Sequence, residues 1–135
     1  APAMLDLCRA KGIATDLRQH DLQDIPWPYD HALFDHVICV GVFHFIDHLE
    51  AIISEASRVL RSGGLFAFTT RQPAAPLAPG EPFAHHVAGG LDIYSHAPES
   101  VAALMARAGF DRLRQLRCYV GQDVFAVWVT RQRSG

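Results

Sequence analysis

"FDHVICVGVFHFIDH", residues 34–48, is the stretch that decides the fold. It begins with an aromatic residue and an acid, runs through valines and an isoleucine, and ends in aromatic residues and histidines. A continuous Val- and Ile-rich run is typical of a strand that helices cover on both faces of a parallel sheet. We therefore predict a buried strand over residues 33–43. Its carboxyl end changes character either for packing reasons or because it is the floor of a binding site.

Helices and strands alternate on either side of this stretch. The helical spacing of apolar residues predicts a helix that is capped by Asp47 and ended by Gly63 and Gly64. Alternation of this kind predicts a three-layer α/β fold with a parallel sheet, and the short connection at Gly121–Gln122 makes the last two strands antiparallel. Further helices are predicted at residues 2–11 and 98–108, and further strands at 13–22, 65–71, 111–120 and 123–131.

Residues 72–97 interrupt this alternation. They are rich in proline and glycine and have no sustained periodicity, so we predict a loop. A connection of this length inside a compact domain is usually functional or mobile. We expect one domain over residues 1–135, in which residues 72–97, the lid segment, cover the substrate.

The composition excludes several classes of protein. Half of the 135 residues are hydrophobic and 19% are charged, which indicates a globular chain. The net charge of −2 gives no reason to expect nucleic-acid binding. The longest apolar run, residues 37–43, is far shorter than the roughly 20 residues that cross a bilayer, so we expect no membrane span. The three cysteines are widely spaced and suggest neither a disulfide framework nor a zinc site, which favours a cytoplasmic protein.

Residues 20–71 carry a resemblance to a known family. The pattern is an acidic residue after a strand, a Pro-containing loop, "FD" before a buried strand, a helix ending in "RVLRSGG", and the strand "LFAFTT". It resembles the carboxyl-terminal two-thirds of a class I S-adenosylmethionine-dependent methyltransferase. "YSHAPESVAALMARAGF", residues 94–110, is similar to the region after the substrate loop in small-molecule members. The resemblance implies a Rossmann-like parallel sheet with a final antiparallel hairpin, S-adenosylmethionine as cofactor, and methyl transfer to a small-molecule acceptor.

One part of the family pattern is not found in residues 1–135. The glycine-rich turn after the family's first strand and the acidic residue after its second are both missing. We therefore expect a partial methyltransferase domain, truncated at its amino terminus, that binds the cofactor poorly alone. The alternative is a catalytically silent, partner-binding module. In either case a sheet edge is left exposed, through which a homodimer could form.

The resemblance assigns roles to individual residues. Asp21 would accept a hydrogen bond from the adenine amino group, and the backbone N–H of Leu22 would meet a ring nitrogen. The alternative for Asp21 is a turn in which it caps its own backbone. Val40 and Gly41 would lie under the methionine part of the cofactor, since ligands bind beyond the carboxyl ends of strands.

Histidines and a tyrosine are the candidates for the acceptor side. His44 would lie near the transferred methyl group, where it could take a proton. His86, Tyr94 and His96, in or at the end of the lid segment, are candidate substrate contacts, and the alternative is that they are solvated. The spacing of His44 and His48 could suggest metal ligation, but no third ligand has supporting spacing, so we predict no metal site.

Overall fold

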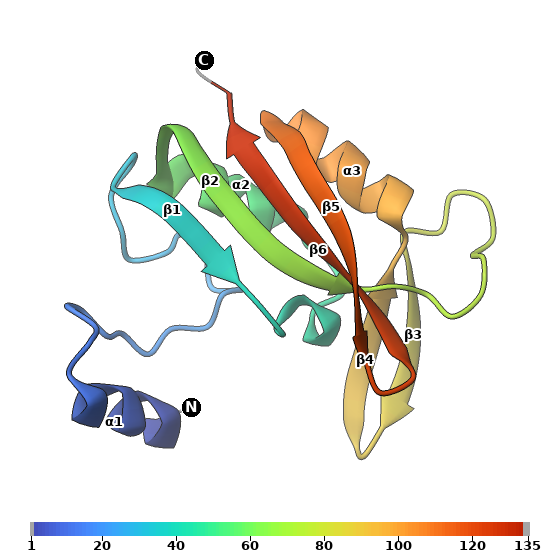
Figure 1. The fold of residues 1–135 in the computed structure, drawn as a ribbon, viewed down its shortest axis with the longest axis horizontal. Helices are drawn as coiled ribbons and strands as arrows, with labels where there is room; N and C mark the ends of the chain where they lie inside the picture. The colour runs from blue at the N-terminus through green and yellow to red at the C-terminus, as the bar shows by residue number, and fades with distance from the viewer. Residues whose placement is uncertain (1, 134–135) are drawn as a thin grey trace.

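The computed structural model describes residues 2–133 and contains a four-stranded mixed sheet in the order β1-β2-β6-β5 (Figure 1). β1 pairs with β2 in parallel, and β2, β6 and β5 pair antiparallel. The Rossmann-like α/β fold and the antiparallel hairpin that closes it are thereby confirmed. The elements are α1 (Pro2–Lys11), β1 (Phe34–Cys39), the 3-10 helix η1 (Phe43–Phe45), α2 (Glu50–Val59), β2 (Leu60–Arg71), β3 (Phe83–Ala88), β4 (Leu91–His96), α3 (Pro98–Arg107), β5 (Phe110–Val120) and β6 (Asp123–Gln132).

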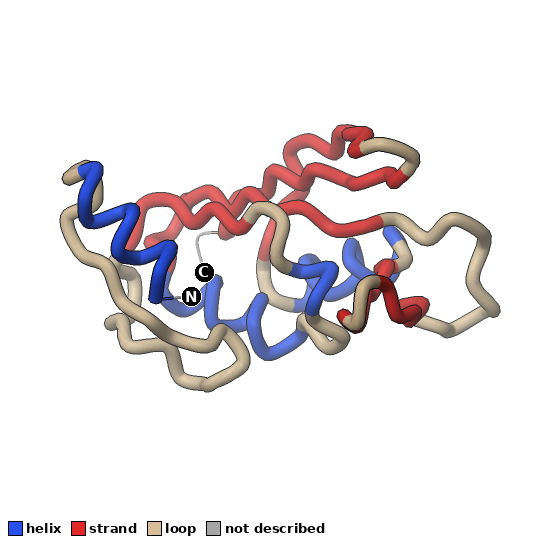
Figure 2. Tube along the Cα trace, turned by 90° about the horizontal axis from the view of Figure 1, so that it is seen from below, coloured by secondary structure: helices blue, strands red, loops and turns tan. Residues whose placement is uncertain are grey.

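The core lies between one face of the sheet and helices α2 and α3 (Figure 2). Strand alternation turns Phe66, Phe68 and Trp128 toward these helices, and each of the three is at most 1% exposed. The indole N–H of Trp128 donates to the Thr70 hydroxyl at 2.9 Å, so the one polar group of this ring is satisfied inside the core. The packed face therefore holds β2 and β6 rigidly, and with them the carboxyl end of β2.

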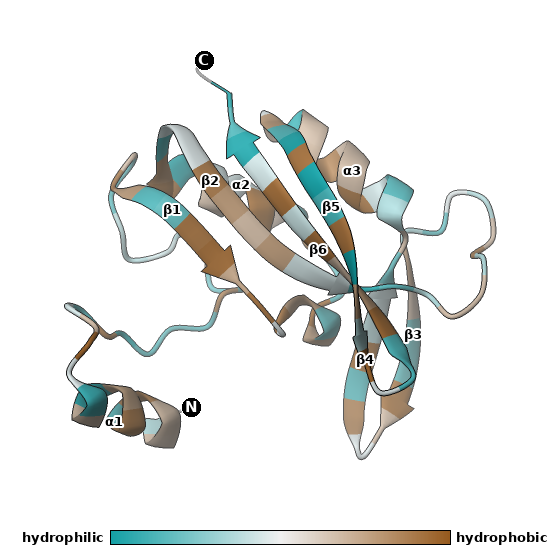
Figure 3. Cartoon of the chain, viewed as in Figure 1, coloured by the Kyte–Doolittle hydropathy of each residue, from teal (hydrophilic) through white to brown (hydrophobic). Residues whose placement is uncertain are grey.

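β1 differs from its prediction in length and in burial. It ends at Cys39, and its burial alternates instead of being continuous. Ile38 is 73% exposed and Val40 is 65% exposed, whereas Val37 packs against the core. The apolar carboxyl half of the strand is visible at this open edge of the sheet (Figure 3). The prediction that both faces are covered is therefore wrong for the described chain, because α2 and α3 lie on one face only.

The strand predicted at residues 13–22 is absent from the described structure. Ile13 is 83% exposed, and the segment pairs with none of the described strands. A strand needs a hydrogen-bonding neighbour, and a local sequence pattern alone does not supply one.

The ends of α2 also differ from their prediction. The residue before the helix is Leu49, with no side-chain cap, and Asp47 Oδ1 instead accepts the N–H of His48 at 2.7 Å. Gly63 and Gly64 lie inside β2, not at the helix end, because the helix stops at Val59. Gly63 has φ 79° where the β1–β2 register shifts, and a Cβ on Gly64 would lie 2.6 Å from the Asp35 carbonyl oxygen. The two glycines thus permit a strand irregularity and a close backbone approach.

The lid segment is not a loop throughout. The prediction of a loop over residues 72–97 is wrong for residues 83–96. Residues 83–96 form a two-stranded antiparallel hairpin, β3–β4, beyond the carboxyl end of β2 (Figure 1). Gly89 and Gly90 are its two turn residues, with φ of 57° and 77°. Two consecutive positive φ values are the requirement of a type I′ hairpin turn, and a Gly-Gly pair meets it without strain. The irregular part of the lid segment is limited to residues 72–82.

Candidate functional site

The carboxyl ends of the parallel strands β1 and β2 are joined by one hydrogen bond. Gly41, which has φ 73°, donates its N–H to the Thr69 hydroxyl at 2.9 Å. The chain turns sharply here into η1, where Phe43 is fully buried and anchors the turn. Val40 and Gly41 therefore form an exposed, sharply turned backbone at the edge where open α/β sheets bind ligands.

A cavity of about 320 Å³, the β1 cavity, lies between β1 and the segment that precedes it. Leu22 and Trp27 line it from that segment, and Cys39 lines it from the end of β1. The Trp27 indole N–H donates to the Leu22 carbonyl at 2.9 Å, which holds this wall together. Burial raises the pKa of the Cys39 thiol to about 11, so this thiol is neutral and presents an apolar surface. The cavity is thus mainly aromatic and apolar.

Asp21 lies in a turn next to this cavity. Its Oδ1 accepts the N–H of Gln23 at 2.9 Å, and its carbonyl accepts the N–H of Asp24 at 3.0 Å. This is the turn that the sequence suggested as the alternative role for Asp21. The carboxylate is exposed, and its second oxygen has no hydrogen-bond partner among residues 2–133, so the turn leaves an acceptor available.

His44 lies in η1, half-buried between two aromatic rings. Its ring centroid is 4.0 Å from that of Phe45 and 5.5 Å from that of Phe125. Partial burial lowers the pKa of His44, and the positive charge of Arg71 lowers it further, while Asp123 opposes the shift. The ring is therefore largely neutral near pH 7 and has a nitrogen able to accept a proton.

Arg71, the last residue of β2, is a site residue that the sequence reasoning missed. Its guanidinium donates to Asp123 at 2.7 Å and to the Ser95 hydroxyl at 3.0 Å, and it lies 3.5 Å from the His86 ring nitrogens. It thereby joins β2, the β3–β4 hairpin and β6, and its charge acts on His44. The signal in the sequence was a charged residue that ends an apolar strand at the ligand-binding edge.

The three substrate candidates of the lid segment are not brought together. His86 faces Arg71, whereas Tyr94 stacks on His85 on the opposite face of the hairpin, with 5.0 Å between centroids. Partial burial raises the pKa of Tyr94, and Asp92 and Asp47 raise it further, so the phenol stays protonated.

The alternative that His96 is solvated is wrong. This residue is only 4% exposed, and its Nε2 lies 2.8 Å from the Ile46 carbonyl oxygen and 3.2 Å from that of Phe43. It anchors the hairpin to η1.

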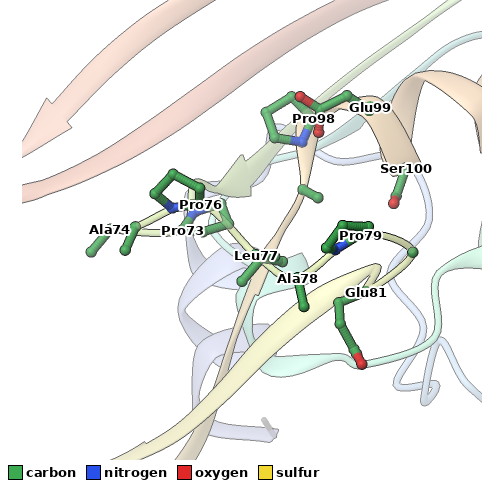
Figure 4. Close-up of a pocket in the computed structure, with 13 residues that line it drawn as sticks. Pro73, Ala74, Pro76, Leu77, Ala78, Pro79, Glu81, Pro98, Glu99 and Ser100 are labelled. Atoms are coloured by element: carbon green, nitrogen blue, oxygen red, sulfur yellow. The ribbon is translucent and has the colours of Figure 1, made fainter.

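The irregular part of the lid segment borders a second, wider hollow. This cavity of about 590 Å³ lies between residues 73–81 and the start of α3 (Figure 4). Prolines and alanines form much of its lining, with Glu81, Glu99 and Ser100 as polar groups. The loop thus stands away from the helix and leaves space between them.

Among the described residues there is neither a cluster of metal ligands nor a membrane-spanning helix. Within residues 2–133 no group of three or more His, Cys, Asp or Glu side chains is arranged to hold a metal ion. His48 is exposed, and its Nε2 lies 3.8 Å from Asp47 Oδ2. None of the described helices is long and apolar enough to cross a membrane.

Comparison with known proteins identifies the family. A family model described as a methyltransferase domain matches residues 1–68, half of the chain. The chain therefore belongs to the methyltransferase domain family, and its mixed sheet with the closing hairpin is the class I S-adenosylmethionine-dependent methyltransferase fold. A solved S-adenosylmethionine-dependent methyltransferase from Methanosarcina mazei superposes on all of this chain and 80% of its own, with a TM-score of 0.77 at 10% identity.

Two mycobacterial relatives are similar in sequence. The chain is 32% identical over 97 residues to "Probable phthiotriol/phenolphthiotriol dimycocerosates methyltransferase 2" of Mycobacterium ulcerans, over 70% of this chain and 36% of that protein. It is 34% identical over 71 residues to "Fatty-acid O-methyltransferase" of Mycolicibacterium smegmatis, over 51% of this chain and 25% of that protein. The chain thus spans about a third or less of the length of these curated relatives.

Proposed function

We propose that this domain uses S-adenosylmethionine to methylate a small-molecule acceptor. The observation that carries the proposal is the turn at Gly41, held by Thr69 where the carboxyl ends of two parallel strands meet. An exposed backbone turn at this position suits an extended ligand such as the methionine part of the cofactor. The family membership supports the same assignment.

The cavity of about 320 Å³ suits the adenine ring of the cofactor. Its aromatic and apolar walls match a flat heterocycle, and the free carboxylate oxygen of Asp21 suits the exocyclic amino group. Leu22 lines the cavity, and its backbone N–H would meet a ring nitrogen. The bound cofactor supplies an activated methyl group on a sulfonium centre. The protein's own residues then bind the cofactor and the acceptor, orient them and exclude water.

The acceptor would lie between η1 and the lid segment. His44 would accept a proton from a hydroxyl or amine acceptor, because its lowered pKa leaves the ring neutral near pH 7. Arg71 would hold an acidic acceptor group through its guanidinium, with His86 beside it. Tyr94, on the opposite hairpin face, would contact only an acceptor that reaches around the hairpin. A fatty acid is the acceptor in the name of one relative, and a carboxylate acceptor would need no base.

Calorimetric titration with S-adenosylhomocysteine tests the cofactor site. Asp21→Ala removes a charge-assisted hydrogen bond worth about 1.5–3 kcal/mol, so the affinity should fall by roughly 10- to 150-fold. Asp21→Asn keeps the turn with its one amide oxygen but presents an N–H donor to the adenine amino group, so its affinity should be no higher than that of Asp21→Ala. Asp111→Ala, which removes an exposed ion pair with Arg133 outside the lining of this cavity, is the matched control. Equal affinity in Asp21→Ala and Asp111→Ala would remove Asp21 from the site.

A partner-binding module remains a second candidate, because of the open edge of β1. Ile38 and Val40 are 73% and 65% exposed beside unpaired strand groups, a surface that favours strand pairing. A homodimer through this edge, in a cytoplasmic protein, is the form we propose for it. Sedimentation of wild type and Ile38→Lys distinguishes the outcomes. A dimer that the lysine disrupts would support the partner-binding module, and a wild-type monomer would count against it.

A further inference from the structure

We propose that the cavity between the start of α2, the helix α3 and the base of the β3–β4 hairpin binds a small neutral molecule that carries a hydroxyl group on an aromatic or apolar body. The cavity has a volume of about 270 Å³. This site is separate from the β1 cavity and does not depend on methyl transfer. Its lining includes Asp47–Glu50, Phe83, His96, Val101, Ala103 and Arg107.

The inner walls of this cavity are apolar and rigid. Leu49 and Val101 are 2% and 1% exposed and belong to the packed core or its edge. The ring of Phe83 stands edge-on to that of His48, with 5.6 Å between centroids and 84° between planes. A void of about 150 Å³ with apolar walls is enough to bind benzene. The space here therefore accommodates a substituted six-membered ring.

His96 gives this apolar space one directional polar group. Both oxygens near its Nε2 belong to backbone carbonyls, which only accept, so Nε2 carries the proton. Burial lowers the pKa of His96, against the raising effect of the two carbonyls, and the neutral ring then has a lone pair on Nδ1.

The lone pair on Nδ1 opens into the cavity. Nδ1 has no hydrogen-bond partner among residues 2–133. No described side-chain nitrogen or oxygen is both fully buried and without a partner, so Nδ1 must be accessible from outside the packed core. Since the His96 side chain lines this cavity and is otherwise buried, we infer that Nδ1 faces it. An acceptor that the cavity alone reaches, and that no described residue satisfies, favours a ligand that donates a hydrogen bond.

The charges at the rim favour a neutral ligand. Glu50 and Arg107 face each other across 3.9 Å, and Asp47 adds a second carboxylate. An anion would meet these carboxylates, and a cation would lose its hydration between the apolar walls, so neither charge is favoured. A hydroxyl is the neutral donor that matches a single acceptor in an apolar pocket.

A ligand in the cavity would alter the hydrogen bonds that hold η1. A donor on Nδ1 polarises the ring and strengthens the bonds from Nε2 to the carbonyls of Phe43 and Ile46. These carbonyls lie at the start of η1 and immediately after it, and His44 lies between them in the chain. The cavity is thus mechanically connected to the turn that leaves the end of β1.

Nitrogen NMR of the ¹⁵N-histidine-labelled chain, with phenol as the probe, tests the proposal. Free protein at pH 7.5 should show His96 as the Nε2–H tautomer, and phenol should shift its Nδ1 resonance saturably. Toluene, of similar size but without a donor, should bind roughly 3- to 10-fold more weakly, which corresponds to one neutral hydrogen bond, and should leave the Nδ1 resonance in place.

The location is tested by filling the mouth of the cavity. Ala103 lines it but is exposed, so Ala103→Trp should block phenol without disturbing the core. Ala106→Trp, on an exposed α3 position outside the lining, is the matched control and should bind phenol as wild type does. Equal affinities for phenol and toluene, an unmoved Nδ1 at saturation, or unchanged phenol binding by Ala103→Trp would each overturn the proposal.

Discussion

Replacing Glu55 with alanine should loosen the wall of the β1 cavity. Glu55 lies on α2 and is 7% exposed. Its Oε1 accepts the Trp27 N–H at 2.7 Å, and both its oxygens accept from the Arg58 guanidinium, at 2.8 and 2.9 Å. Arg58 in turn donates to the carbonyls of Tyr29 and Trp27, at 2.8 and 3.1 Å. Two helical residues thus hold a loop that has no secondary structure of its own.

The expected loss of stability follows from the acceptors that disappear. Glu55→Ala leaves the Trp27 N–H without its charged acceptor, and a partly buried donor left unpaired costs about 1–3 kcal/mol. With a urea m-value of about 2 kcal/mol per molar for a chain of this size, the midpoint of unfolding should fall by about 1 M. Asp35→Ala is the control, because its 2.8 Å pair with Arg61 is 71% and 58% exposed and should contribute at most about 1 kcal/mol.

The effect of Glu55 should also depend on pH. Hydrogen bonds from Arg58 lower the pKa of Glu55, more than burial raises it, so its contribution is present above the unfolded value of 4.5. The stability difference between wild type and Glu55→Ala should therefore shrink as the pH falls below 4.5 through the folded pKa. Urea titrations at pH 7 and pH 3.5 measure both expectations. A midpoint within 0.3 M (~0.6 kcal/mol) of wild type at pH 7 would refute the reasoning.

Three further outcomes are expected. Replacing residues 81–90 with a short Gly/Ser linker should leave the affinity for S-adenosylhomocysteine nearly unchanged and lower turnover of the true acceptor at least about tenfold; unchanged turnover would place acceptor recognition outside the lid segment. Burial lowers the pKa of His96, so the folded chain should lose stability as pH falls from the unfolded value of 6.5 toward the folded pKa, and His96→Gln should lose part of this slope in urea titrations; identical slopes would contradict the assignment. Methyl transfer should survive EDTA, and loss of activity that zinc restores would revive a metal role for His44 and His48.

The local pattern of the chain determined the elements that carry their own signals. Apolar residues at helical spacing placed α2 and α3, and the Val- and Ile-rich run placed β1. The short connection at Gly121 made β5 and β6 antiparallel. The same pattern missed the β3–β4 hairpin, although Gly89–Gly90 between two short alternating runs was a hairpin signal. The many prolines and glycines of residues 72–97 favoured the prediction of a loop over that of a hairpin.

Only the tertiary structure decided the features that depend on contacts between segments far apart in the sequence. Residues 13–22, predicted as a strand, pair with no described strand, and β1 has a buried-strand pattern with one face open. The order of the chain places Arg71, His86 and Ser95 far apart, and the sheet edge gathers them around one guanidinium. The sequence places His96 at the end of a predicted loop, yet in the structure it is buried at the end of β4 and hydrogen-bonded next to η1. Sequence records the preferences of single segments, whereas pairing, burial and the pKa of a side chain depend on what other segments place beside it.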